Sequence, residues 1–199
     1  FDQPGTGEAP VPLAPGSERM FSQVLDELAK RPDIDARKIA VYGGSFGAHW
    51  AAKLAVAERE RLCAVVAQSP PVHDAFQPDF LKTAFVTKEY LFDRGPALAS
   101  MYEKVRTPED LLAAAPRNSL LEQGWLERPT LEPMLVIAGV HDTQVPIADV
   151  HRLLRTGNAK SAWINPNGGH MGRDAHGWVD PKIFAAITVP WLLQAIKGS

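Results

Sequence analysis

The residues of this chain that could do chemistry begin with a serine in a glycine-rich run. Residues 43–47 read Gly-Gly-Ser-Phe-Gly, a G-x-S-x-G pattern with Ser45 at its centre. The apolar run 39–42 comes directly before it and an alanine-rich stretch follows to about Glu60, which predicts a buried strand and then a helix. Between these elements the serine sits in a strained turn, and small neighbours let the strand and the helix approach. We therefore predict that Ser45 is a nucleophile.

The same turn would place a hydrogen-bond donor beside the serine. The backbone N–H of Phe46 lies at the start of the predicted helix, where the helix dipole stabilises negative charge that develops on an oxygen atom. The alternative role for such glycines is a phosphate-binding loop, which needs Lys and then Ser or Thr after the last glycine. This chain has Ala48-His49 there. Phe46 is therefore the predicted oxyanion donor.

A carboxylate and an imidazole follow two later predicted strands. Asp142 comes just past the apolar run 134–138, and His170 follows the run 161–164 and a pair of glycines at 168–169. Ser, Asp and His in this chain order, each after a strand, are typical of the nucleophile, acid and base of a hydrolytic triad. We predict Asp142 as the acid and His170 as the base.

Other carboxylates and histidines fit these roles less well. Glu132 precedes its strand, and Asp149 lies on the helix that follows. His176 is the alternative base, whereas His141, next to the acid, is expected to support the site or to be solvated. The six histidines lack the i, i+4 pairing on a helix that is typical of a zinc site. The sequence therefore predicts no metal and no cofactor.

Strands and helices alternate along most of the chain, which predicts a parallel α/β sheet flanked by helices. A further strand is expected over 62–67, and helices are expected over 17–31, 46–60, 147–156 and 181–196. Pro190 should kink or break the last helix. Residues 72–127 carry helix signals but no strand pattern. We therefore divide the chain into a core segment 1–71, a helical cap 72–127 and a second core segment 128–199.

Composition argues against several classes of function. The 199 residues are 45% hydrophobic and 22% charged, as in an ordinary globular domain. The net charge of −2, without a long run of one sign, argues against a nucleic-acid or membrane-surface protein. No apolar stretch approaches the ~20 residues that a membrane helix needs. The single cysteine, Cys63, cannot form an internal disulfide. We expect a cytoplasmic protein, with any signal before Phe1 outside the sequence.

With Ser45, Asp142 and His170 in that order, the chain resembles the α/β-hydrolase superfamily over essentially its full length. The opening Phe1-Asp2-x-Pro4-Gly5-x-Gly7-Glu8 and the long interval between Ser45 and Asp142 are similar to those of the fermentation–respiration switch esterase-like group. That group includes dihydroxypseudooxynicotine hydrolase and fungal pigment hydrolases that shorten polyketides by cleaving carbon–carbon bonds. The resemblance implies an α/β-hydrolase fold with a helical cap inserted before the acid-bearing strand.

The resemblance also implies strands that this sequence lacks. In such folds the nucleophile follows the fifth strand, whereas here it is residue 45. The early strands, including the expected neighbour of 39–42, and the loop that gives the second oxyanion donor are therefore missing. We expect the N-terminal remainder of a longer protein, or a second polypeptide, to complete the sheet and supply that donor. A homodimer is left open.

The implied chemistry is acyl transfer to water through an acyl-enzyme, on an ester, an amide or an activated carbon–carbon bond of the β-diketone type. Seven aromatic residues in the predicted cap form either its own core or an apolar acyl pocket: Phe76, Phe80, Phe85, Tyr90, Phe92, Tyr102 and Trp125. From these we take Phe80, Phe85 and Tyr90 as candidate substrate-binding residues for an apolar or aromatic small molecule. The alternatives are a prolyl-oligopeptidase-like peptidase and a catalytically inactive hydrolase fold that acts as a binding module.

Overall fold

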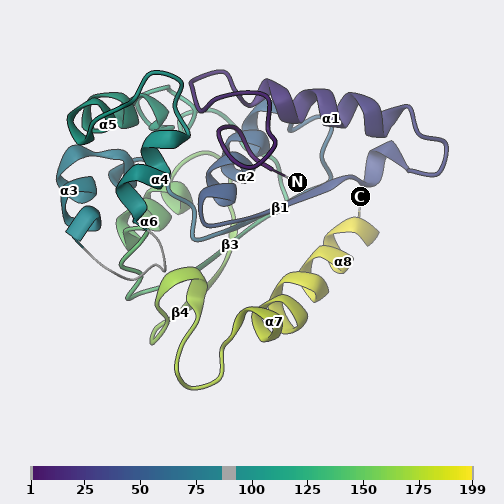
Figure 1. The fold of residues 1–199 in the computed structure, drawn as a ribbon. Helices are drawn as coiled ribbons and strands as arrows, with labels where there is room; N and C mark the ends of the chain where they lie inside the picture. Colours follow the sequence, from purple (N-terminus) through teal and green to yellow (C-terminus); the bar gives the residue numbers. More distant parts are fainter. Residues whose placement is uncertain (1, 87–92, 199) are drawn as a thin grey trace.

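The computed structural model describes residues 2–86 and 93–198. At its centre is a sheet of four parallel strands in the order β1-β2-β3-β4 (Figure 1). The strands are β1 (Ala40–Gly44), β2 (Ala64–Gln68), β3 (Met134–Gly139) and β4 (Ser161–Asn165). Each of the four predicted strands is present, with its ends within two residues of the expected positions.

Helices cover both faces of this sheet, which gives three layers. One face carries α1 (Arg19–Ala29), α2 (Phe46–Ala57) and α6 (Ile147–Arg155), and the other carries α7 (Asp180–Ile183) and α8 (Val189–Lys197). A π-helical turn, Phe184–Thr188, joins α7 to α8. It lies just before Pro190, which has no N–H to continue the helical ladder. The predicted interruption is therefore a change of helical pitch rather than a break.

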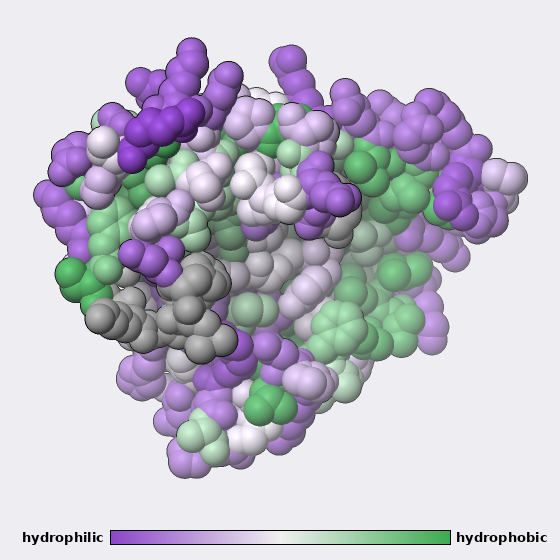
Figure 2. Space-filling model, viewed as in Figure 1, coloured by the Kyte–Doolittle hydropathy of each residue, from purple (hydrophilic) through white to green (hydrophobic). Residues whose placement is uncertain are grey.

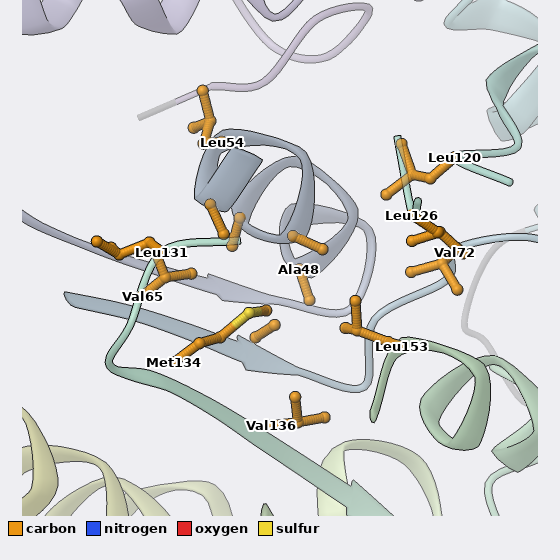
Figure 3. Packing of buried hydrophobic residues seen from close by; sticks show 14 of the residues in the cluster. Ala48, Leu54, Val65, Val72, Leu120, Leu126, Leu131, Met134, Val136 and Leu153 are labelled. Atoms are coloured by element: carbon orange, nitrogen blue, oxygen red, sulfur yellow. The ribbon is translucent and has the colours of Figure 1, made fainter. Parts of the chain in front are cut away.

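Side chains of the two central strands alternate between these layers, as the strand period of two requires. Val65 on β2 and Val136 on β3 point toward α2 and α6 in the main core (Figure 3). Val66 and Ile137 point the other way and pack with Ile183 of α7. Because both faces are covered, every residue of β2 and β3 is buried. The sheet thus forms a rigid base for the loops at its carboxyl edge.

The segment between β2 and β3 contains helices and, in its described part, no strand. Its elements are a 3₁₀ turn (Asp74–Phe76), α3 (Pro78–Val86), α4 (Arg94–Ser100), α5 (Pro108–Ala114) and a second 3₁₀ turn (Ala115–Asn118). Thr107 and Asp110 form the capping box that starts α5. Leu81, Val105 and Leu111 bring α3 and α5 together in a small core of their own. The predicted helical character of 72–127 is therefore present, and its role as a cap stays a prediction.

The outer side of β1 pairs with no other strand in the part of the chain that the structure describes, as predicted. Apolar side chains remain exposed beside it. Tyr42 on β1 is 41% exposed and Phe184 is 46% exposed, and their rings meet edge to face with centroids 5.6 Å apart. Figure 2 shows hydrophobic surface gathered on this side, between α1 and α8. Within residues 2–86 and 93–198, the β1 edge of the sheet therefore has no partner strand and carries exposed apolar side chains.

Candidate active site

Ser45 occupies a strained turn between β1 and α2. Its backbone angles, φ 52° and ψ −121°, lie outside the regions that residues with a Cβ usually adopt. The turn is so tight that a Cβ at position 43 would lie 2.1 Å from the carbonyl oxygen of Gly47, so only glycine fits there. The N–H of Ser45 donates to the carbonyl of Gln68 at 2.8 Å, which ties the turn to the end of β2. The serine is therefore held at the carboxyl edge of the sheet.

Asp142 lies in the loop that follows β3. Its Oδ1 accepts hydrogen bonds from the backbone N–H groups of Gln144 and Val145, both at 2.9 Å. Burial disfavours the ionised carboxyl, but the hydrogen bond and charge of His170 and these two N–H groups outweigh it. The pKa of Asp142 therefore lies below its ordinary value. The group is an ionised carboxylate at neutral pH.

His170 joins the other two side chains through its two ring nitrogens. Nδ1 lies 3.1 and 3.0 Å from the two carboxyl oxygens of Asp142, and Nε2 lies 2.9 Å from Oγ of Ser45. Because the carboxylate can only accept, the proton of the neutral ring resides on Nδ1, and Nε2 accepts from the serine hydroxyl. The side chains of His170 and Asp142 are 9% and 2% exposed. The three sequence-predicted residues are thus brought together in one hydrogen-bonded series.

The competing residues lie elsewhere. Glu132 is exposed at the opposite end of β3. His176 and His141 are exposed as well. Asp149 is fully buried and accepts the backbone N–H groups of residues 72–75 instead of an imidazole.

A cavity of about 400 Å³ opens beside Ser45. Phe46 lies in its wall next to the serine, and Phe76, Leu98 and Tyr102 from the segment 72–127 also line it. Most of the remaining lining side chains are apolar, and the guanidinium of Arg94 is the exception that carries charge among the described residues. The arrangement can hold an apolar group of modest size against Ser45.

None of the three substrate-binding residues predicted from the sequence is found in the described wall of this cavity. Phe80 and Phe85 belong to α3 and are not among the residues that line this cavity, and Phe85 packs into the small core around Leu81 and Leu111. Tyr90 lies outside the described residues. A helix periodicity shows which residues share a face, but not which neighbour that face meets.

Sequence reasoning also missed a segment of the cavity wall. Residues 5–7, Gly-Thr-Gly, line the cavity together with Ser45. Gly5 has φ 80°, and a Cβ there would lie 2.4 Å from the carbonyl oxygen of Met101 at the end of α4. The G-x-G pattern, with glycines that tolerate positive φ, is the signal that could have indicated a close approach of backbone.

The described residues contain no group of three or more His, Cys, Asp or Glu side chains placed to hold a metal ion. Within those same ranges, no helix is long and apolar enough to cross a membrane.

Comparison with known proteins shows the family to which this chain is related. A family model described as esterase FrsA-like matches residues 2–163. The chain is 32% identical over 152 residues to esterase FrsA of Vibrio cholerae, an alignment that covers 75% of this chain and 35% of that protein. It is 30% identical over 191 residues to esterase FrsA of Salmonella schwarzengrund, with coverage of 92% and 45%. The chain thus spans less than half the length of these relatives.

Solved structures share the fold. A 2,6-dihydroxy-pseudo-oxynicotine hydrolase matches 98% of this chain with a TM-score of 0.78 at 23% identity, over 51% of its own chain. AbyA5 matches 98% with a TM-score of 0.72 at 22% identity, over 56% of its own chain. At such identities the likeness concerns the fold, which is that of the α/β-hydrolases. Because the family model matches well over half of its residues, this chain belongs to the esterase FrsA-like family.

Proposed function

We propose that this chain carries the catalytic centre of a serine hydrolase that cleaves an ester of an apolar small molecule. The observation that supports it most is the unbroken series from Ser45 through His170 to Asp142, with Ser45 in the wall of the apolar cavity. The names of the relatives favour an ester over an amide or a β-diketone. A scaffold without catalytic function would have no need to keep Ser45 in a strained turn.

The reaction follows from the geometry. Nε2 of His170 takes the hydroxyl proton of Ser45 as Oγ attacks the carbonyl carbon, and the charged imidazole is stabilised by Asp142. The backbone N–H of Phe46 donates to the oxyanion, because Phe46 begins α2 directly after the nucleophile. His170 then returns the proton to the leaving alcohol. In the second half, His170 takes a proton from water as the water attacks the acyl-enzyme, and returns it to Oγ of Ser45 as the acid is released. The second oxyanion donor would come from outside this chain.

The segment 72–127 would act as the cap that selects the acyl group. Phe76, Leu98 and Tyr102 all come from it and face the same cavity as Ser45. A cavity of about 400 Å³ lies in the range that small-molecule sites occupy. An acyl chain of several carbons, or a single aromatic ring, fits such a volume. The cap would also exclude water from the acyl-enzyme until the alcohol has left.

The test uses the full-length protein, a fluorophosphonate probe and p-nitrophenyl esters of increasing acyl length. Wild type should be labelled once, at Ser45, and should release p-nitrophenol. Ser45→Ala should lose the label and lower kcat by roughly 10⁴-fold or more. The matched control is Ser161→Ala at the exposed start of β4, which should behave as wild type. Retention of labelling or turnover by Ser45→Ala would exclude this mechanism.

A further inference from the structure

The backbone of Met171, the residue after His170, is bound by Gln68, the last residue of β2, and by Ser69, the residue that follows it. Met171 has φ 61° and ψ 19°, a left-handed conformation that residues with a Cβ rarely adopt. Its N–H donates to Oγ of Ser69 at 2.9 Å, and its carbonyl accepts from Nε2 of Gln68 at 2.8 Å. Gln68 and Ser69 are 2% and 0% exposed, so water does not compete for these bonds. An unfavourable conformation is thus fixed by two buried side chains.

The chemistry of the partners fixes the orientation of the Gln68 amide. The carbonyl of Met171 can only accept, so the NH₂ group must face it. The amide oxygen then faces Tyr42, whose hydroxyl donates to it at 2.6 Å. A carboxylate at position 68 would set two acceptors against each other, and an aliphatic side chain would leave the Met171 carbonyl unpaired. The site therefore requires glutamine's donor.

The same end of β2 also holds the nucleophile and contacts the acid-bearing strand. The carbonyl of Gln68 accepts the N–H of Ser45 at 2.8 Å, and the N–H of Ser69 donates to the carbonyl of Ile137 on β3 at 2.7 Å. Gln68 and Ser69 therefore fix the positions of both the nucleophile turn and the loop that carries His170, through their backbone and side-chain hydrogen bonds. The distance between Ser45 and His170 depends on both.

We infer that Gln68 and Ser69 are positioning residues for His170. They hold Met171 in its left-handed conformation, and this directs the preceding imidazole between Ser45 and Asp142. The inference rests on the proposed function, because it concerns the histidine that acts there as base. Neither side chain touches the reacting atoms. Their effect is on the geometry of proton transfer, in which a displacement of 1 Å costs about 10²-fold in rate.

The first experiment compares variants of the full-length protein on one p-nitrophenyl ester. Gln68→Met keeps the length of the side chain and removes its donor, and Ser69→Ala removes the acceptor. Each should lower kcat by roughly 10- to 100-fold with KM within about threefold of wild type. The matched control is Tyr42→Phe, which breaks the other hydrogen bond of the Gln68 amide and leaves the bond to Met171. It should stay within about threefold of wild type in kcat.

A rescue separates positioning from a general loss of packing. Asparagine adopts the left-handed conformation far more readily than methionine. Met171→Asn, added to the Gln68→Met variant, should therefore recover at least about threefold of the lost kcat. An unchanged kcat in Gln68→Met, an equal loss in Tyr42→Phe, or no recovery in the double variant would each overturn the inference.

A crystal structure of the full-length Gln68→Met variant tests the positioning role of Gln68 without any measurement of activity. We expect Met171 to leave the left-handed region and Nε2 of His170 to move away from Oγ of Ser45. If wild type proves inactive on every ester and unlabelled by the fluorophosphonate, the proposed function fails, and this displacement still tests the positioning role. An unmoved Met171 and His170 would overturn it.

Discussion

Oγ of Ser45 lies 2.9 Å from Nε2 of His170, although Ser45 follows β1 and His170 follows β4, the two outer strands of the sheet in this chain. The loop after β4 must therefore run back over the carboxyl ends of β3 and β2. It passes β3 at Gly139 and reaches Gln68 and Ser69 at the end of β2. The N–H of His141 donates to the carbonyl of Gly168 on the way, at 2.8 Å. The contact between Ser45 and His170 thus depends on this crossing of the loop after β4 over the ends of β3 and β2.

The crossing predicts that Gly139 tolerates no side chain. A Cβ there would lie 2.2 Å from the carbonyl oxygen of Gly169 and 2.3 Å from that of Gly168, so the loop would have to move. We expect Gly139→Ala to lower kcat of the full-length protein by roughly 10²-fold, because His170 moves with the loop. Steady-state kinetics on a p-nitrophenyl ester measures this. Gly95→Ala, where the nearest atom lies 3.7 Å away, should change kcat less than twofold, and equal losses in the two variants would contradict the crossing argument.

The cavity predicts which side chain limits the acyl group. Leu98 lines the cavity, whereas Phe80 does not. Leu98→Trp should fill much of the space and lower kcat/KM for octanoyl esters by at least about tenfold, while the acetyl ester is spared. Phe80→Ala is the matched comparison and should leave the ratio of the two substrates unchanged. Kinetics on the two p-nitrophenyl esters decides between the residues, and a shifted ratio in Phe80→Ala alone would instead support Phe80 as the substrate-binding residue.

Much of the fold and of the candidate site could be predicted because parallel strands place their carboxyl ends together. Ser45, Asp142 and His170 each follow a predicted strand, so their proximity required only the fold class. The lining of the cavity required more, since Phe76 and Phe80 lie close in sequence and yet only Phe76 faces it. The left-handed Met171 was beyond prediction, because methionine gives no local signal for positive φ and the conformation depends on partners about a hundred residues away.

His49 predicts an acid-sensitive fold. It is 1% exposed, its Nδ1 lies 3.0 Å from the carbonyl of Pro71, and burial lowers its pKa from 6.5 to about 3. In the unfolded chain His49 therefore binds a proton below pH 6.5, whereas in the folded chain it does so only below about pH 3. The stability that neutral His49 contributes is complete above pH 6.5 and is lost as the pH falls, by at most about 1.4 kcal/mol per pH unit.

Denaturant unfolding of the full-length protein between pH 7 and pH 4 measures this slope. His49→Asn keeps an N–H for the Pro71 carbonyl and has no titratable ring, so its stability should fall less steeply with decreasing pH. His151→Asn replaces an exposed histidine on α6 and should keep the wild-type slope. Parallel curves for wild type and His49→Asn would show that the buried ring does not control the acid response.

Asp149 predicts a strong link between the core and the start of the segment 72–127. Its carboxylate, fully buried on α6, accepts four backbone N–H groups, those of Val72 and residues 73–75, at 2.7–3.1 Å. Asp149→Asn keeps the shape but turns an NH₂ group toward these donors, so at least two N–H groups lose their acceptor. Since hydrogen bonds to a charged group contribute about 1.5–3 kcal/mol each, we expect a loss of roughly 3 kcal/mol in unfolding free energy.

Urea unfolding of the full-length protein tests this link, with Asp74→Asn as the neighbouring control. Asp74 pairs with Arg152 at 3.3 Å, and their side chains are 31% and 34% exposed, so this substitution should cost less than about 1 kcal/mol. Because residues 72–75 lead directly to Phe76 in the cavity wall, Asp149→Asn should also raise KM for long acyl esters more than it lowers kcat. A loss in Asp149→Asn no larger than that in Asp74→Asn would mean that the four hydrogen bonds hold the segment no more firmly than an exposed ion pair does.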